Sequence, residues 1–282
     1  MLIVGSDPAL HRALDALARE ARLVFFAGLP GTGKSLLIHQ LAHLAHTRGR
    51  PVHLLQWDVA RPVFEASAAG RRYPQAHGVT HGVIRVGVGR WARAAVAQWA
   101  GTHPAADILI GETPFIGHRL IDLARPADDD AETVLAAAST RFVIPVPSRE
   151  LRAHLEAERA RRAAAPLHER EREDAPPDVL RELWHQVVAA ARALGLTTAP
   201  PSAPYDPAIY ERVYAHLLRG RHANALPLSA RLPAAQVSAY DFRVATADLV
   251  PSEAEASRYV EDVERELTGD AVSREIARWY RP

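Results

Sequence analysis

The sequence predicts an α/β fold in which a parallel sheet of about five strands is covered by helices on both faces. Apolar runs of strand length alternate with segments of helical periodicity along most of the chain. This alternation is typical of parallel sheets whose strands are joined by right-handed helical crossovers. The chain has 282 residues, of which 48% are hydrophobic and 24% charged, and this suits one globular α/β domain with additions.

The composition excludes several classes of protein. The chain contains no cysteine, which excludes disulfides, cysteine-bearing zinc sites and thiol catalysis. A formal net charge of +1 gives no general attraction to nucleic acid or to an anionic membrane. The apolar run at the start is too short for a signal peptide, and no segment is long enough to span a bilayer. We therefore expect a cytoplasmic protein with no membrane partner, and the sequence gives no clear signal for nucleic-acid binding.

The first elements follow from capping residues and apolar spacing. Asp7 is a typical N-cap and Pro8 a typical first helical residue, so a helix is expected from there to about Arg22. The apolar run at 23–27 then predicts the first strand. A second helix is expected to begin near residue 33 and to end at about 47.

The rest of the chain continues the alternation. Further strands are expected at 52–57, 107–111, 142–146 and 222–228. Pro145 indicates irregular or edge pairing of the fourth strand, because proline has no amide to donate. Ser148 is expected to cap a long charged helix, which Pro176-Pro177 separates from a helix ending at Gly195. Later helices are expected after Asp206-Pro207 and at 252–267 and 271–280, whereas residues 71–89 show no firm pattern.

The loop between the first strand and the second helix carries the most specific motif. It matches the pattern G-x-x-x-x-G-K-[ST] through Gly28, Leu29, Pro30, Gly31, Thr32, Gly33, Lys34 and Ser35. Successive backbone amides of such a loop converge on an anion, and the following helix points its positive dipole end at the same place. Lys34 is also the only lysine among 34 basic residues. Chance occurrence of the motif is therefore a poor explanation.

On this motif the chain resembles the P-loop NTPase superfamily. The resemblance implies a nucleotide substrate, ATP, bound together with Mg²⁺. It implies that Lys34 lies along the β- and γ-phosphates and that the Ser35 hydroxyl completes the Mg²⁺ shell. The nucleotide-binding set that it implies runs from Gly28 to Ser35 and includes Leu36.

In its order of parts the chain resembles the small-kinase branch: the nucleotide, shikimate, adenylylsulfate and zeta-toxin-like kinases. The resemblance implies an acceptor base at the end of strand two, where Asp58 stands, and an arginine-rich lid, in which we favour Arg152 and Arg159. Residues 1–230 would form the kinase-like domain, with its charged helical lid near 148–195. Residues 231–282 would form a C-terminal helical extension packed on it.

The expected activity is transfer of the γ-phosphate of ATP to a hydroxyl group of an unidentified acceptor. The alternative is a P-loop ATPase, or a nucleotide-dependent regulator without an acceptor. Glu112, after strand three, would position the metal or its water, because Gly111 stands where the superfamily usually has aspartate. A GTPase is excluded, since its N-K-x-D motif needs a second lysine.

Each candidate has a structural alternative. Asp58 could cap the short helix expected from Ala60, and Glu112 could cap a helix after strand three. The lid arginines alternate with glutamates, which suits a salt-bridged solvent helix as well as a phosphate clamp.

Overall fold

A computed structural model describes residues 2–76, 78–166, 168, 176–232 and 244–281. Its centre is one six-stranded sheet in the order β5-β4-β1-β3-β2-β6, and every neighbouring pair is parallel. The strands are β1 (Leu23–Ala27), β2 (Val52–Leu55), β3 (Ile108–Thr113), β4 (Thr140–Pro147), β5 (Ala223–Leu228) and β6 (Ala247–Asp248). The prediction of about five strands missed β6, because a two-residue strand leaves no apolar pattern.

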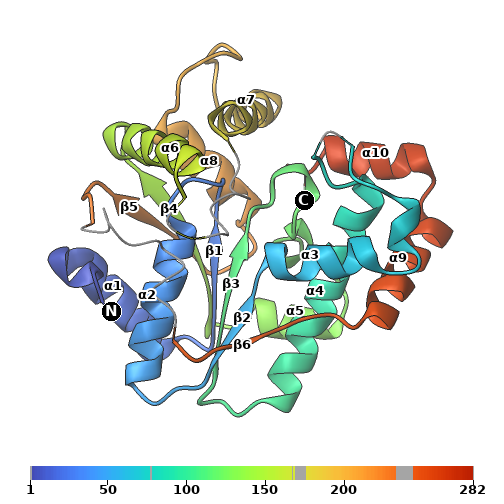
Figure 1. Ribbon diagram of the computed structural model, residues 1–282, viewed down its shortest axis with the longest axis horizontal. Helices are drawn as coiled ribbons and strands as arrows, with labels where there is room; N and C mark the ends of the chain where they lie inside the picture. Colours follow the sequence, from blue (N-terminus) through green and yellow to red (C-terminus); the bar gives the residue numbers. More distant parts are fainter. Residues whose placement is uncertain (1, 77, 167, 169–175, 233–243, 282) are drawn as a thin grey trace.

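Helices cover both faces of the sheet, as predicted (Figure 1). Side chains of β1 point alternately to the two faces. Val24 and Phe26 pack with α1 (Pro8–Glu20) and α2 (Lys34–Thr47). Leu23 and Phe25 belong to the larger core on the other face. That core also contains residues from α3 (Trp57–Ala66), α4 (Gly82–Thr102), α5 (Asp130–Leu135), α7 (Pro177–Ala193) and α8 (Pro207–Leu217).

The predicted caps begin the predicted helices. The Asp7 carboxylate accepts hydrogen bonds from the amides of Ala9 and Leu10 at the start of α1. The Ser148 hydroxyl accepts from the Leu151 amide at 3.1 Å and so begins α6 (Arg149–Ala164). The Asp206 carboxylate caps α8 in the same way. Local side-chain chemistry therefore fixes where these three helices start.

Helix α4 begins inside the segment that showed no firm pattern. Its first half, residues 83–89, is buried on every side, so the sequence there lacks an alternation of apolar and polar faces. Gly89 shows how close its neighbours come, since a Cβ there would lie 1.9 Å from an Asp122 carboxylate oxygen. Two of its buried positions are arginines, Arg85 and Arg93, which sequence patterns normally assign to a surface.

Pro145 does not mark an edge strand. β4 lies between β5 and β1, and Pro145 stands opposite Leu226 of β5. The pairing with β1 ends at Val143, so the missing proline amide costs no hydrogen bond on that side.

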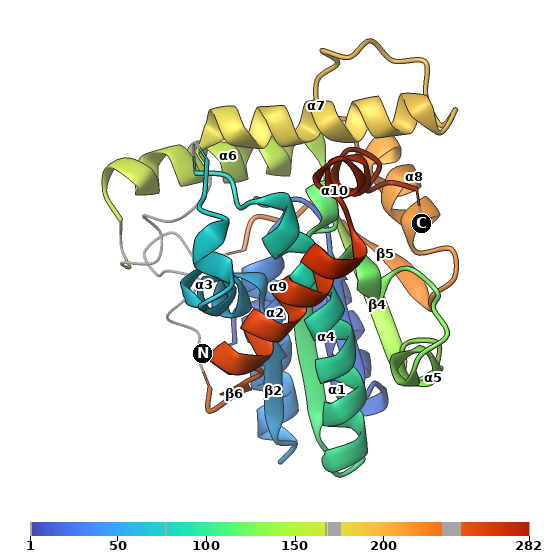
Figure 2. The same cartoon turned by 90° about the vertical axis from the view of Figure 1, so that its right-hand side faces the viewer.

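The C-terminal extension packs on the larger core, as Figure 2 shows. Its helices α9 (Glu253–Glu266) and α10 (Gly269–Ala277) lie against α3 and α4. The extension also contributes β6, which pairs with β2 at the edge of the sheet. Residues 233–243, and 167 and 169–175 of the predicted lid, lie outside the described part of the chain. In that described part, no helix combines the length and apolar character that crossing a membrane requires.

Candidate functional site

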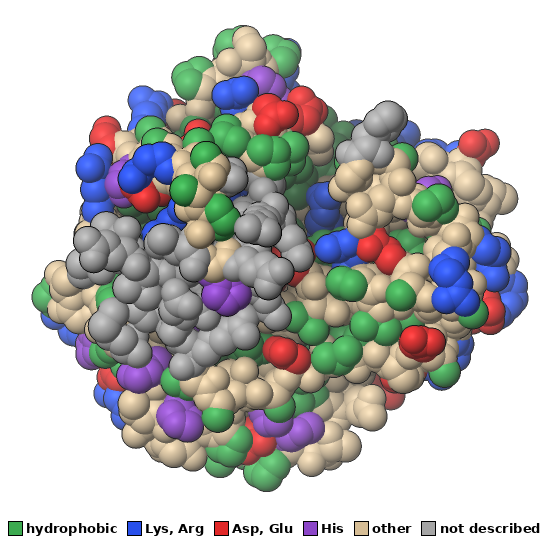
Figure 3. Space-filling view, in the orientation of Figure 1, with side chains coloured by type: hydrophobic (Ala, Val, Ile, Leu, Met, Phe, Trp, Pro, Cys, Tyr) green, Lys and Arg blue, Asp and Glu red, His purple; other side chains and the backbone are tan. Residues whose placement is uncertain are grey.

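A cavity of about 1040 Å³ opens where β1, β2 and β3 end. Its walls come from the loop after β1, the start of α3, the turn after β3, and the facing sides of α6 and α7. Figure 3 shows the surface hollowed between the part that carries α6 and α7 and the part that carries α3 and α10. The predicted residues that line the cavity are Pro30, Gly31, Thr32, Gly33, Lys34, Ser35, Leu36, Asp58, Glu112 and Arg159. Gly28, Leu29 and Arg152 are not part of its lining.

The loop between β1 and α2 needs its glycines for backbone reasons. Gly31 (φ 74°) and Gly33 (φ 86°) adopt left-handed conformations that other residues rarely take. Glycine is required at position 28 because the Tyr210 side chain lies close to the backbone there, and a Cβ would lie 2.1 Å from the Tyr210 hydroxyl oxygen. The Thr32 hydroxyl donates to the Leu29 carbonyl at 2.9 Å and closes the loop. The loop is therefore held in one shape by its own bonds and by α8 behind it.

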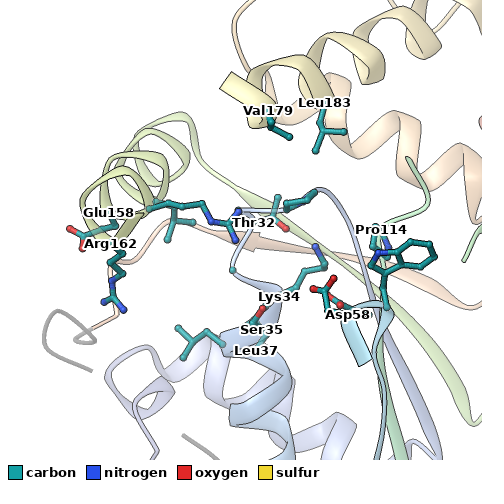
Figure 4. A pocket seen from close by; sticks show the side chains of 18 of the residues that line it. Thr32, Lys34, Ser35, Leu37, Asp58, Pro114, Glu158, Arg162, Val179 and Leu183 are labelled. Atoms are coloured by element: carbon teal, nitrogen blue, oxygen red, sulfur yellow. The ribbon is translucent and has the colours of Figure 1, made fainter. Parts of the chain in front are cut away.

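Lys34 is a buried cation at the floor of the cavity (Figure 4). Its ammonium group donates to the Leu29 carbonyl at 2.8 Å. Burial lowers the pKa of Lys34 from 10.5 to about 8, opposed by the negative charge of Glu112 and, more weakly, of Asp58. Arg159 and Arg152 lower the pKa further. The lining of the cavity as a whole carries Lys34 and five arginines against four carboxylates.

Asp58 lies beside Lys34, as Figure 4 shows. Helix α3 begins at Trp57 with Gln56 as its N-cap, so Asp58 is the second residue of the helix. The alternative that Asp58 caps a helix starting at Ala60 is therefore wrong. Its position in the first turn still favours the charged carboxylate, because the helix dipole is positive there.

Glu112 belongs to β3 and stands opposite Phe26 of β1. The backbone after it forms a tight turn around Ile116, and the predicted helix there is only a single 3-10 turn whose N-cap position is Phe115. Glu112 therefore caps no helix. Among the charges around Lys34, that of Glu112 raises the lysine pKa most.

The two predicted lid arginines have different surroundings. The Arg152 side chain is 3% exposed and donates to the Pro30 carbonyl at 2.9 Å and to Glu156 at 2.6 Å. Its guanidinium also lies over the Tyr205 ring. Arg152 thus connects α6 to the loop through its bond to Pro30. It is salt-bridged, as the structural alternative to a phosphate clamp predicted, but it is buried rather than solvated. Arg159, two turns later, lines the cavity.

Sequence reasoning missed Arg119, which lines the cavity from the turn after β3. Phe115, His118 and Leu120 all have positive φ in this turn, a conformation that costs on the order of 1–3 kcal/mol per non-glycine residue. The Arg119 guanidinium donates to the Ile116 carbonyl at 3.1 Å and lies over the Trp57 ring. Burial lowers its pKa, and the nearby Asp58 raises it. Gly117 was the one sequence sign of an irregular turn, and nothing distinguished Arg119 from other arginines.

Part of the segment without a firm pattern also reaches the cavity, through Gln75, Gly78 and Thr80. The Gln75 amide and the Thr80 hydroxyl both donate to the Glu65 carboxylate. Arg61 donates to the same carboxylate at 2.6 Å. Glu65 therefore gathers the polar groups on the wall furthest from α6.

Comparison with known proteins identifies no relative of this chain. No family model matches the chain, and no curated protein or solved structure matches it with statistical significance. The function must therefore be argued from the residues of the cavity. Among them are a buried ammonium, the carboxylates of Asp58 and Glu112, and the guanidinium groups of Arg119 and Arg159.

Proposed function

We propose that this chain is an ATP-binding P-loop phosphotransferase that transfers the γ-phosphate to a hydroxyl group of an acceptor. One observation carries the proposal. Lys34, Asp58 and Glu112, which come from three different strand ends, line a single cavity together with Arg159. Ligands of parallel α/β sheets bind at the carboxyl ends of the strands, which is where this cavity lies.

The residues present fit a phosphate chain. Burial disfavours the charged form of Lys34 and lowers its pKa. A nearby anion would stabilise this charged ammonium, because the negative charge compensates the loss of solvation. Gly31 and Gly33 leave the backbone of the loop accessible from the cavity side. Ser35 and Glu112 offer the oxygen ligands that Mg²⁺ prefers. When bound, Mg²⁺ would neutralise charge on the phosphoryl group during transfer.

The acceptor would lie on the side of Asp58. Phosphoryl transfer requires an aligned hydroxyl and a group that takes its proton as the new bond forms. Asp58 lines the cavity beside Lys34 and belongs to α3, which forms one wall of the cavity. Arg119 lies close enough for the charge of Asp58 to raise the Arg119 pKa, so positive charge stands beside the carboxylate that would act as the base.

A second candidate, an ATPase without an acceptor, has one observation in its favour. Glu112 has the largest influence of any charged group on the pKa of Lys34, so a carboxylate stands near the proposed phosphate position on the β3 side. A carboxylate there could orient a water molecule instead of an acceptor hydroxyl. The two activities differ in which carboxylate they require.

The deciding experiment supplies γ-labelled ATP and Mg²⁺ with a panel of hydroxyl-bearing metabolites, nucleosides and sugars. A kinase yields a labelled acceptor, whereas an ATPase yields labelled inorganic phosphate with every member of the panel. Lys34→Ala protein prepared in the same way measures the background. Consumption of ATP by the parent at the Lys34→Ala level would contradict both activities.

A further inference from the structure

At the other end of the sheet, three potential metal ligands converge. One ring nitrogen each of His53 and His103 and one carboxylate oxygen of Asp107 all lie within 4.8 Å of one another. His53 is in β2, His103 ends α4 as its C-cap, and Asp107 directly precedes β3. This cluster therefore lies where β2 and β3 begin, far along the sheet from the cavity (Figure 1).

We propose that His53, His103 and Asp107 form a binding site for a divalent transition-metal ion of the zinc class. Two imidazoles and one carboxylate are ligands that zinc accepts, with water in the fourth position. The proposal is independent of the nucleotide site, because none of these residues lines the cavity.

The hydrogen bonds of the His103 ring leave its Nε2 available as a metal ligand. Its Nδ1 lies 3.0 Å from the Trp99 carbonyl, which can only accept a hydrogen bond. The Thr102 hydroxyl, also 3.0 Å away, has its own proton directed to the Gln98 carbonyl. Nδ1 must therefore carry the hydrogen, and the lone pair of the neutral ring is on Nε2. A histidine whose second nitrogen donates to a carbonyl is the usual arrangement around bound metals.

His53 and Asp107 already stand at a suitable separation. His53 Nε2 and an Asp107 carboxylate oxygen are 3.1 Å apart. Ligands about 2.0–2.2 Å from a tetrahedral zinc ion are about 3.3–3.5 Å apart, so the metal can replace the proton shared by this pair. The His103 ring nitrogen lies within 4.8 Å of both, so reaching this spacing takes a shift of at most about 1.5 Å. Its side chain is half-buried rather than fully packed.

The backbone that carries the ligands is fixed by two arginines. Arg22 donates to the carbonyls of Ala100 and His103, each at 2.8 Å. Arg50 donates to the carbonyls of Ala106 and Asp107. Preorganised ligands bind a metal with less loss of entropy, whereas the two guanidinium charges oppose a divalent ion. We therefore expect weaker binding than at a four-ligand zinc site.

Cobalt provides the test, because four- or five-coordinate Co²⁺ absorbs visible light much more strongly than hydrated Co²⁺. The full-length protein, stripped with a chelator, is titrated with Co²⁺ in excess Mg²⁺, which saturates sites that prefer oxygen ligands. We expect one strongly absorbing Co²⁺ per chain, and at least a tenfold weaker signal in His103→Gln and Asp107→Asn. His46→Gln, which removes an exposed histidine of α2, should match the parent.

Three results would overturn the site. They are a parent spectrum of hydrated Co²⁺ only, a His103→Gln spectrum equal to that of the parent, and loss of the signal in His46→Gln. X-ray absorption of the zinc-loaded parent gives an answer that depends on no variant. Two imidazoles should appear around the metal, and a shell without imidazole would show that His53 and Asp107 form only an ion pair.

Discussion

At the start of the sheet, arginines donate mainly to backbone carbonyl groups, whereas at its end arginines line a cavity. Arg22 donates to two carbonyl groups and Arg50 to four. At the other end, Arg119 donates to a single carbonyl, and it lines the cavity together with Arg159. The residue type is the same, but the surroundings of the guanidinium groups differ.

The two ends of the sheet also differ in backbone conformation. Non-glycine residues with positive φ occur only in the turn after β3, among the described residues. Strained backbone persists only where its surroundings fix it, and it is concentrated at functional sites. Comparing the two ends teaches that an arginine is a candidate for ligand binding when its side chain lines a cavity. Arg152 fails this criterion although it lies only seven residues from Arg159.

Lys34→Ala should have the largest effect on activity. Removing the ammonium that faces the developing phosphate charge should lower ATP turnover by about 10³-fold or more. Steady-state ATP consumption measures this, and circular dichroism checks the fold. Arg50→Ala is the matched control, because it should lower the melting temperature and leave turnover per folded molecule unchanged. Equal turnover in Lys34→Ala and the parent would remove the distinction between the two ends.

Asp58→Asn should separate the two candidate activities. In a kinase it should slow transfer to the acceptor by about 10²–10⁴-fold, while ATP binding persists. In an ATPase, hydrolysis should fall with Glu112→Gln and change little with Asp58→Asn. The measurement is labelled product per unit time for both variants. Transfer at the parent rate by Asp58→Asn would show that another group takes the proton.

Lys34→Met should change how the stability of the ligand-free protein depends on pH. The folded pKa of Lys34 is about 8 and the unfolded value 10.5, so between these values the unfolded chain binds more protons. The contribution of Lys34 to stability therefore rises with pH across that range. From pH 7.5 to pH 10 the parent should gain about 2–3 kcal/mol over Lys34→Met in urea unfolding. An identical pH dependence would mean that burial does not disfavour this charge.

Arg152→Gln and Arg159→Gln should have opposite signatures. Arg152→Gln leaves the Pro30 carbonyl and Glu156 without their donor and should lower the free energy of unfolding by about 1–3 kcal/mol. Arg159→Gln should lower turnover by about 10–100-fold, since a charge-assisted contact contributes roughly 1.5–3 kcal/mol. Urea unfolding and steady-state kinetics on both variants measure these effects. A larger loss of turnover in Arg152→Gln would reverse the roles assigned to them.

The elements that could be predicted from the sequence are those specified by local chemistry. Helix starts at Asp7, Ser148 and Asp206 follow from side chains that bind their own backbone. The apolar runs of β1 to β4 were visible because buried parallel strands are apolar on both faces. β6 and the start of α4 were not, because their placement depends on partners far away in the sequence.

The site residues also fall into those that local sequence could predict and those that it could not. The loop around Lys34 could be predicted because its spacing is local, and the strand ends placed Asp58 and Glu112 on the same cavity. Arg119 could not, because its position depends on a strained turn and on packing against Trp57. The difference between Arg152 and Arg159 also required the structure, since only the path of α6 decides which of them reaches the Pro30 carbonyl.

Because Lys34 is the only lysine, covalent labelling of lysine side chains would modify this chain at a single known position. A side-chain amine with a pKa of about 8 is substantially unprotonated in mildly alkaline buffer, where ordinary lysines are not. Only the α-amino group competes for an acylating reagent, and a digest separates the two products. A single fluorophore or crosslinker can thus be directed into the cavity of the unaltered protein. The rate at which it attaches would report how often that cavity opens, and protection from it would report what enters.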